Sequence, residues 1–260
     1  MITSTSNTRV KNVMQLQKKM KVRKEQNVFV IEGAKMLQET PRQLLREVYV
    51  SHSFLEKGEH RDLLKGISYE IVDDRVFGQM SDTSTPQGIL CVVTQMHYTI
   101  EEFIKREQPF LMILEDLQDP GNVGTIFRTA EGAGADGIIL SKNCVDIFNP
   151  KTIRSTMGSI YRIPFLYVED LGEVLKVLNK NNIWTYAAHL EGKQMYDREN
   201  YTLGTALLIG NEGNGLSAQM AKKASCLVKI PMEGELESLN AAVASAILMY
   251  EVHRQRRENE

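Results

Sequence analysis

The sequence predicts an α/β protein made of two successive domains, and three observations support this fold class. In residues 1–95, short β-type runs alternate with helical stretches, an order that produces layered α/β structure. From residue 109 onward, the apolar runs are hydrophobic on both faces, as buried strands of a parallel sheet are. A chain of 260 residues, 42% hydrophobic and 25% charged, is long enough to bury two modest cores.

The first predicted domain spans residues 1–95. A basic run with interleaved apolar residues predicts an amphipathic helix over 9–24. Strands are expected over 28–31, 47–51, 68–72 and 88–94, with helical segments over 34–39, 61–65 and 75–80. Pro41 ends the helical segment that precedes it. The polar residues 96–108 are predicted to link this domain to the next.

The second predicted domain spans residues 109–260. Strands are expected over 110–114, 137–140, 165–168, 184–188, 206–209 and 226–230, mostly with helices between them. The first half of the final helix, 241–257, is apolar nearly all round, so both of its faces must be covered. The sheet covers one face. Because Ala242 and Ala246 allow close helix approach, we expect a second subunit on the other, in a homodimer formed through this domain.

The net charge of −2 is unevenly distributed along the chain. Residues 1–50 carry ten Lys and Arg against four Asp and Glu, whereas residues 107–260 carry fifteen against twenty. A concentrated basic segment favours a polyanionic partner such as nucleic acid, although a solvated helix face has the same composition. The densest part of this segment contains Lys18, Lys19, Lys21, Arg23 and Lys24.

Membrane, secretory and metal-binding classes find no support in the sequence. The longest apolar runs, such as 89–93, are far shorter than the roughly 20 residues of a membrane helix. Residues 1–12 are polar and lack the apolar core of a signal peptide, so we expect a cytoplasmic protein. The three cysteines, Cys91, Cys144 and Cys226, lie far apart, and no histidine lies in ligand spacing with another, so we expect neither disulfides nor a metal site.

Residues 132–137 match the dinucleotide-binding pattern G-x-G-x-x-G, but their context disfavours that function. The motif acts after a strand and at the start of a helix. Here a helical stripe precedes the glycines and a predicted strand follows them. We therefore interpret them as the end of a helix and a turn.

Three other segments place polar residues after predicted strands, at the sheet edge where open α/β folds bind ligands. The first, DPGNVGTIFRT (119–129), enters a helix that Asn122 is suited to cap, and Arg128 faces away from the apolar stripe of that helix. A plain helix cap and a solvated arginine are the alternatives for these two residues. The second, LLIGNEGNGL (207–216), contains three glycines that let a ligand approach the backbone. The third, IPMEGELESLN (230–240), leads into the final helix.

In this order, the three segments resemble the motifs of the SpoU (TrmH) branch of the SPOUT RNA methyltransferases. Residues 149–158 also look like that family, and residues 29–33 are similar to its N-terminal substrate-binding domain. The resemblance implies a C-terminal SPOUT domain with a trefoil knot and a smaller N-terminal α/β domain. It further implies methyl transfer from S-adenosylmethionine to a ribose 2′-hydroxyl, with S-adenosylhomocysteine as the product and no metal.

Carried over to this chain, the resemblance implies three groups of site residues. The methyl-donor pocket would be lined by Gly210, Glu212, Ile230, Met232, Ser238 and Leu239. The substrate ribose would face the catalytic residues Asn122, Arg128, Glu212 and Asn240. RNA would also contact Arg154 and the basic segment of the first domain.

Two further expectations concern the segment around Arg128. Because an arginine is normally always protonated, we expect Arg128 to stabilise a developing alkoxide rather than to act as a free base. Thr125 and Phe127 stand where many relatives have small residues, and we expect them to narrow the space beside the pocket.

Ribosomal RNA is the expected substrate, because several relatives with that substrate carry the additional N-terminal domain. The alternatives are a transfer RNA 2′-O-methyltransferase, an RNA-binding protein with a methyltransferase fold and no turnover, and an unrelated α/β protein. Loss of Arg128, Asn240 or the glycine turn would indicate the non-catalytic alternative, and all are present.

Overall fold

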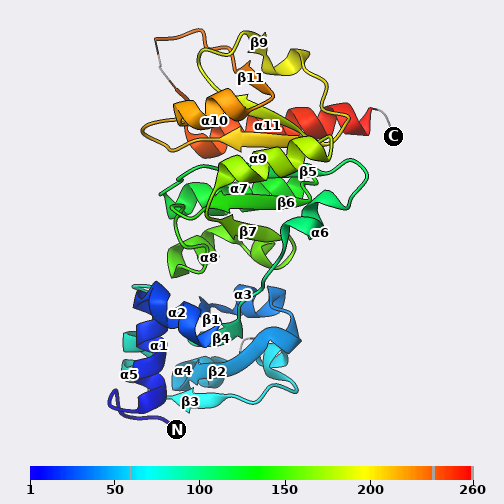
Figure 1. The fold of residues 1–260 in the computed structure, drawn as a ribbon. Coiled ribbons are helices and arrows are strands. Elements are labelled where there is room, and N and C mark those ends of the chain that lie inside the picture. Colours follow the sequence, from blue (N-terminus) through cyan, green and yellow to red (C-terminus); the bar gives the residue numbers. More distant parts are fainter. Residues whose placement is uncertain (59, 236–237, 259–260) are drawn as a thin grey trace. The chain divides into compact units, whose positions relative to one another are not determined.

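The computed structural model describes residues 1–58, 60–235 and 238–258, and the chain divides into two compact units. The first comprises Met1–Met96 and Asp146–Tyr161, and the second comprises His97–Val145 and Arg162–Glu260. Each unit has its own sheet, which can be followed in Figure 1. The segment Asp146–Tyr161, which the sequence-based division assigned to the C-terminal domain, thus lies in the first unit. Leu236 and Glu237 of the third motif lie outside the described residues.

The first unit contains a four-stranded sheet in the order β1-β4-β2-β3. Strand β4 is antiparallel to β1 and β2, and β3 is parallel to β2. The strands are β1 (Val28–Glu32), β2 (Leu45–Ser51), β3 (Glu70–Val72) and β4 (Ile89–Thr94). The helices are α1 (Thr8–Lys18), α2 (Met20–Gln26), α3 (Ala34–Glu39), α4 (His52–Lys57), α5 (Asp74–Met80) and α8 (Pro150–Thr156), with short 3-10 helices at Arg42–Leu44, Arg61–Leu64 and Ser159–Tyr161.

The strands predicted for residues 1–95 are confirmed, but the basic helix is divided. Lys19 has an extended backbone (φ −119°, ψ 110°), so α1 ends and α2 begins around it. Val10, Val13 and Leu16 of α1 pack with α5 and the sheet in the core of the unit. The lysines of the same segment remain outside that core.

The second unit contains a seven-stranded sheet in the order β7-β6-β5-β10-β8-β11-β9, and every neighbouring pair is parallel. The predicted buried parallel sheet is therefore confirmed. The strands are β5 (Phe110–Leu114), β6 (Gly137–Ser141), β7 (Phe165–Val168), β8 (Trp184–Ala188), β9 (Gln194–Met195), β10 (Thr205–Ile209) and β11 (Cys226–Lys229). The helices are α6 (Ile100–Ile104), α7 (Pro120–Gly132), α9 (Leu171–Lys180), α10 (Ala218–Lys223) and α11 (Ala241–Arg257), with a 3-10 helix at Tyr196–Arg198.

The parallel arrangement brings the three polar motifs to one edge of this sheet. Strands β5 and β10 are neighbours with Leu114 opposite Ile209, so the chain leaves both strands at the same level. The Asn211 side-chain amide donates to the Asp116 carbonyl at 2.7 Å, which joins the two turns that follow. This edge is where a ligand of an open α/β sheet is expected.

The fold bears on two functions that the sequence disfavours, dinucleotide binding at residues 132–137 and membrane insertion. Helix α7 ends at Gly132 and β6 begins at Gly137, which confirms that the glycines between them form a helix end and a turn. Within the described ranges, no helix is both long enough and apolar enough to cross a bilayer.

Candidate active site

The N-cap of helix α7 lies three residues earlier than the predicted cap, Asn122. Its N-cap is Asp119, whose carboxylate accepts a hydrogen bond from the Asn122 backbone N–H at 2.8 Å, and Pro120 occupies the first turn. The prediction that Asn122 caps this helix is therefore wrong, because an aspartate and a proline three residues upstream supply a stronger start signal. The Asn122 side chain is left available for contacts across the sheet edge.

Three of the four predicted catalytic residues form one hydrogen-bonded chain. Asn240 is the N-cap of α11, where its side-chain oxygen Oδ1 accepts from the backbone N–H of Ala242 at 2.9 Å and of Val243 at 3.3 Å. Its amide donates to the Asn122 side-chain oxygen at 3.0 Å, and the Asn122 amide donates to Glu212 at 3.1 Å. The three motifs, which are far apart in sequence, are thereby joined.

The Glu212 carboxylate is the acceptor at one end of this chain. Its carboxylate also accepts from the backbone N–H groups of Gln118 and Asp119, each at 3.0 Å. Partial burial raises the pKa of Glu212, but these hydrogen bonds and that from Asn122 outweigh burial and lower the pKa below its usual value. At neutral pH Glu212 is therefore ionised, and its carboxylate fixes the orientation of the Asn122 amide.

A cavity of about 320 Å³ opens beside this network at the carboxyl edge of the sheet. All six residues predicted for the methyl-donor pocket line it: Gly210, Glu212, Ile230, Met232, Ser238 and Leu239. Sequence reasoning missed a further wall formed by Ala188, His189 and Leu190. The available signal was the end of strand β8, which shares the edge with β10 and β11.

The glycine turn lets the backbone form part of the cavity wall. Asn211 and Gly215 exchange two backbone hydrogen bonds of 3.0 and 2.9 Å, and Gly215 has a φ of +66°. A Cβ atom at Gly210 would lie 2.2 Å from the backbone of Gly215 and Leu216. Only glycine fits at position 210 without displacing the turn, so a ligand there meets main-chain groups.

A second cavity adjoins the first and contains the amide network. It is lined by Asp119, Asn122, Glu212, Ser238, Leu239, Asn240 and Ala241, four of which also line the first cavity. Two ligands bound in these cavities would therefore lie side by side. No group of three or more His, Cys, Asp or Glu residues with metal-binding geometry occurs among the described residues.

Arg128 is not part of either cavity within one chain. It is exposed on α7, six residues or about 9 Å along the helix from Asn122. It makes no hydrogen bond or ion pair with any residue that the structure describes. Helix α7 packs against α11: a Cβ atom at Gly132, four residues beyond Arg128, would lie 3.3 Å from the Tyr250 hydroxyl. Val243 and Tyr250 of α11 are about half exposed, at 49% and 51%.

Thr125 and Phe127, which were expected to narrow the space beside the pocket, line neither cavity of a single chain. Phe127 is fully buried and packs edge-on against Phe165, with ring centroids 5.7 Å apart. Thr125 is exposed on the surface of α7. Neither residue lines either cavity, because the helix turns one into the core and the other outward.

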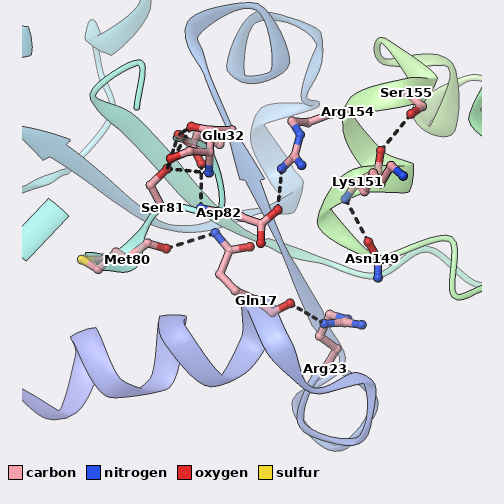
Figure 2. A network of polar contacts seen from close by, with 11 residues as sticks. Gln17, Arg23, Glu32, Met80, Ser81, Asp82, Asn149, Lys151, Arg154 and Ser155 are labelled. Carbon is pink, nitrogen blue, oxygen red and sulfur yellow. Dashed lines mark hydrogen bonds and ion pairs between the residues drawn. The ribbon is translucent and has the colours of Figure 1, made fainter. Parts of the chain in front are cut away.

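The residues predicted to contact RNA lie in the first unit and fall into different classes. Lys18, Lys19, Lys21 and Lys24 are exposed. Arg23 is only 3% exposed and donates to Asp146 at 2.6 and 3.1 Å and to the carbonyls of Leu16 and Gln17. The prediction that Arg23 contacts RNA is therefore wrong, because its guanidinium already donates its hydrogen bonds to groups inside the unit. Arg154 is partly exposed and pairs with Asp82 at 2.9 Å (Figure 2).

The second unit thus combines a parallel α/β sheet with two adjoining cavities, one lined by the glycine turn and apolar side chains and the other containing the amides of Asn122 and Asn240. The SpoU rRNA Methylase family matches residues 109–250, and an MRM3-like substrate binding domain matches residues 7–91. The chain therefore belongs to the SpoU rRNA methylase family.

Relatives and solved structures match nearly the whole chain. The 23S rRNA (guanosine(2553)-2′-O)-methyltransferase RlmP of Bacillus subtilis (strain 168) is 34% identical over 252 residues, covering 96% of this chain and 97% of the relative. The AdoMet-bound rRNA methyltransferase from Sinorhizobium meliloti superposes with a TM-score of 0.83 at 29% identity, covering 97% of both chains. The SpoU methyltransferase AviRb from Streptomyces viridochromogenes in complex with AdoMet gives a TM-score of 0.86 at 26% identity, covering 96% of this chain and 98% of that chain.

Proposed function

We propose that this protein transfers the methyl group of S-adenosylmethionine to a ribose 2′-hydroxyl of ribosomal RNA. The observation that carries the proposal is the Asn240–Asn122–Glu212 hydrogen-bonded chain, which borders a second cavity directly beside the predicted donor cavity. The family membership and the relative that acts on 23S rRNA support the same reaction and substrate class.

The residues of the first cavity fit the methyl donor. A volume of about 320 Å³ lies within the range of small-molecule sites, and Gly210 allows main-chain groups to approach an adenosine without an intervening side chain. Ile230, Met232 and Leu239 supply apolar walls. When bound, S-adenosylmethionine supplies an electrophilic methyl group on a sulfonium.

The second cavity would hold the substrate ribose. The 2′-hydroxyl is a weak acid, so it would release its proton to solvent water as its oxygen attacks the methyl carbon. The methyl–sulfur bond of the donor would break as the new C–O bond forms, and the departing sulfur would be a neutral thioether. Asn122 and Asn240 would orient the hydroxyl, and Glu212 keeps both amides in place. Holding the two reactants in adjoining cavities supplies much of the rate by proximity.

Arg128 is proposed to stabilise the developing alkoxide from a second copy of the chain. It lies on the exposed surface of α7, a helix that contacts α11 with its half-exposed Val243 and Tyr250, and it lines neither cavity of its own chain. A homodimer that covers these apolar residues would bring Arg128 of one copy toward the second cavity of the other. The proposal includes cytoplasmic action and the trefoil knot of the family.

Methyl transfer can be tested with radiolabelled S-adenosylmethionine and protein-free ribosomal RNA, followed by alkaline hydrolysis. A 2′-O-methyl group blocks cleavage at its own linkage, so label is expected in alkali-resistant dinucleotides. Label in mononucleotides would indicate a methylated base and contradict the ribose assignment. Label in transfer RNA but not ribosomal RNA would favour the transfer RNA alternative, and binding of RNA without any transfer would favour the non-catalytic one.

A further inference from the structure

Arg154 and Asp82 form an ion pair on the surface of the first unit, between α8 and the loop that follows α5 (Figure 2). One guanidinium nitrogen of Arg154 donates to one carboxylate oxygen of Asp82 at 2.9 Å. The two side chains are 35% and 40% exposed. The other nitrogens of Arg154 make no hydrogen bond with a residue that the structure describes. This pair therefore uses only part of the donor capacity of the arginine.

A buried carboxylate fixes the position of the loop that carries Asp82. Glu32, which is 9% exposed, accepts from the Ser81 hydroxyl at 2.7 Å, the Thr83 hydroxyl at 2.8 Å and the Asp82 backbone N–H at 3.3 Å. The backbone of the loop is thus held while the Asp82 carboxylate faces Arg154. Residues 84–87 of the same loop are exposed and carry hydroxyl and amide groups.

A second cation accompanies Arg154 on α8. Lys151 lies three residues earlier, so the two side chains occupy neighbouring positions on the helix surface. The Lys151 ammonium is exposed, and no described residue forms an ion pair or a hydrogen bond with it. The surface thus combines two cations, one carboxylate and a hydroxyl-rich loop. Asp82 accepts only one hydrogen bond from Arg154, whereas a phosphodiester on this surface could accept two and would also attract Lys151.

We propose that Arg154 exchanges Asp82 for a phosphate of bound RNA, and that Asp82 is a built-in competitor that limits the affinity of the first unit for RNA. This inference rests on the proposed function, in which RNA is the substrate. A phosphate that cannot engage Arg154 fully leaves the ion pair intact and meets the repulsion of the Asp82 carboxylate. RNA whose phosphate contacts Arg154 only partly is therefore bound more weakly, because the Asp82 carboxylate repels it.

The exchange can be tested by equilibrium binding of protein-free 23S ribosomal RNA to single variants of the full chain. Asp82→Asn removes the competing charge and keeps the side-chain shape, so we expect binding about 2- to 5-fold tighter, the range typical of a partly exposed ion pair. Asp62→Asn is the matched control, because Asp62 is exposed in the same unit, pairs with Lys65 and gives the same change in net charge. It should change binding less than Asp82→Asn does.

A double variant identifies Arg154 as the residue through which Asp82 acts. Arg154→Ala should weaken binding, and adding Asp82→Asn to it should recover less than Asp82→Asn contributes alone. Equal gains from Asp82→Asn and Asp62→Asn, or an undiminished gain in the Arg154→Ala background, would overturn the proposal. Methyl transfer measured in parallel separates the two ideas. A gain that depends on Arg154 without any transfer would refute the enzymatic function alone, whereas no RNA binding by the unaltered chain would refute both.

Discussion

The two units of this protein present opposite kinds of groups to their ligands. The cavity edge of the second unit is formed by backbone, apolar side chains and the amides of Asn122 and Asn240, and its Glu212 carboxylate is already satisfied internally. The first unit exposes lysines around the α1–α2 break and the Arg154–Asp82 pair. We infer that the second unit selects its ligand by shape and hydrogen bonding, whereas the first attracts a polyanion by charge. Salt should therefore strongly weaken RNA binding by the first unit and have little effect on ligand binding by the second unit.

The largest expected effect tests whether every cation of the basic segment belongs to that charged surface. Arg23→Met leaves the Asp146 carboxylate, which is 12% exposed, without its partner, so we expect the first unit to lose about 3–5 kcal/mol of unfolding free energy. Urea denaturation measures this loss. Lys24→Gln, one position along on an exposed site, is the control and should change stability by about 0.5 kcal/mol or less. Arg23→Met that weakens RNA binding at unchanged stability would return Arg23 to the RNA surface.

The next effect tests whether the site of the second unit is complete in one chain. Arg128→Ala should reduce methyl transfer by about 10²- to 10³-fold, as loss of a group that stabilises a developing oxyanion does. Binding of S-adenosylhomocysteine, measured by calorimetry, should not change because Arg128 lines neither cavity. Thr125→Ala, on the exposed surface of the same helix, is the control. Undiminished transfer would remove Arg128 from the mechanism.

Mixing two impaired variants then locates the arginine, at a donor concentration too low for the Gly210→Ala chain to be active alone. A heterodimer of Arg128→Ala and Gly210→Ala chains contains one intact donor cavity, in the chain that lacks Arg128. Activity returns only if the arginine comes from the other copy. Failure of the mixture to regain activity, with heterodimers shown to form, would assign Arg128 to its own chain.

A smaller effect tests the claim that main-chain groups line the donor cavity. Gly210→Ala places a Cβ atom 2.2 Å from the backbone of the glycine turn, so the turn must shift and binding of S-adenosylhomocysteine should weaken by about 10- to 100-fold. Gly213→Ala is the matched control, because its nearest contact would be the Asn211 side-chain oxygen at an ordinary 3.6 Å. Equal affinities of the two variants would show that the backbone approach at position 210 does not matter.

The residues of the two cavities were predictable because a motif records spacing along the chain, and a parallel sheet brings the ends of its strands to one edge. Gly210, Ile230 and Leu239 were found in this way. The wall at Ala188–Leu190 was missed because it carries no unusual residue pattern, only its place after β8. The direction of the Asn122 side chain depended on which residue starts α7, and Asp119 and Pro120 compete for that role within a few residues.

The charged residues were harder to assign from sequence, because charge alone does not say which way a side chain points. Arg23 has the same charge as its exposed neighbours, but it lies on α2, beyond the break at Lys19, and donates to the carbonyls of Leu16 and Gln17 at the end of α1. A single continuous basic helix did not indicate this burial. The position of Asp146, far along the chain, was not available to sequence reasoning. Segment Asp146–Tyr161 packs in the first unit through contacts that only the folded chain reveals.

The smallest expected effect concerns the exposed lysines one at a time. If Lys18, Lys19, Lys21 and Lys24 each neutralise an RNA phosphate, replacing one by Gln should lower the slope of log affinity against log salt by about 0.7–0.9, because one fewer counterion is released. RNA binding measured over a fourfold range of salt would resolve this change, and Lys57→Gln, outside this segment but in the same unit, is the control. Binding of S-adenosylhomocysteine should be insensitive to both substitutions. An unchanged slope for all four lysines would leave them as a solvated helix face and would confine RNA recognition by the first unit to surfaces such as that of Arg154.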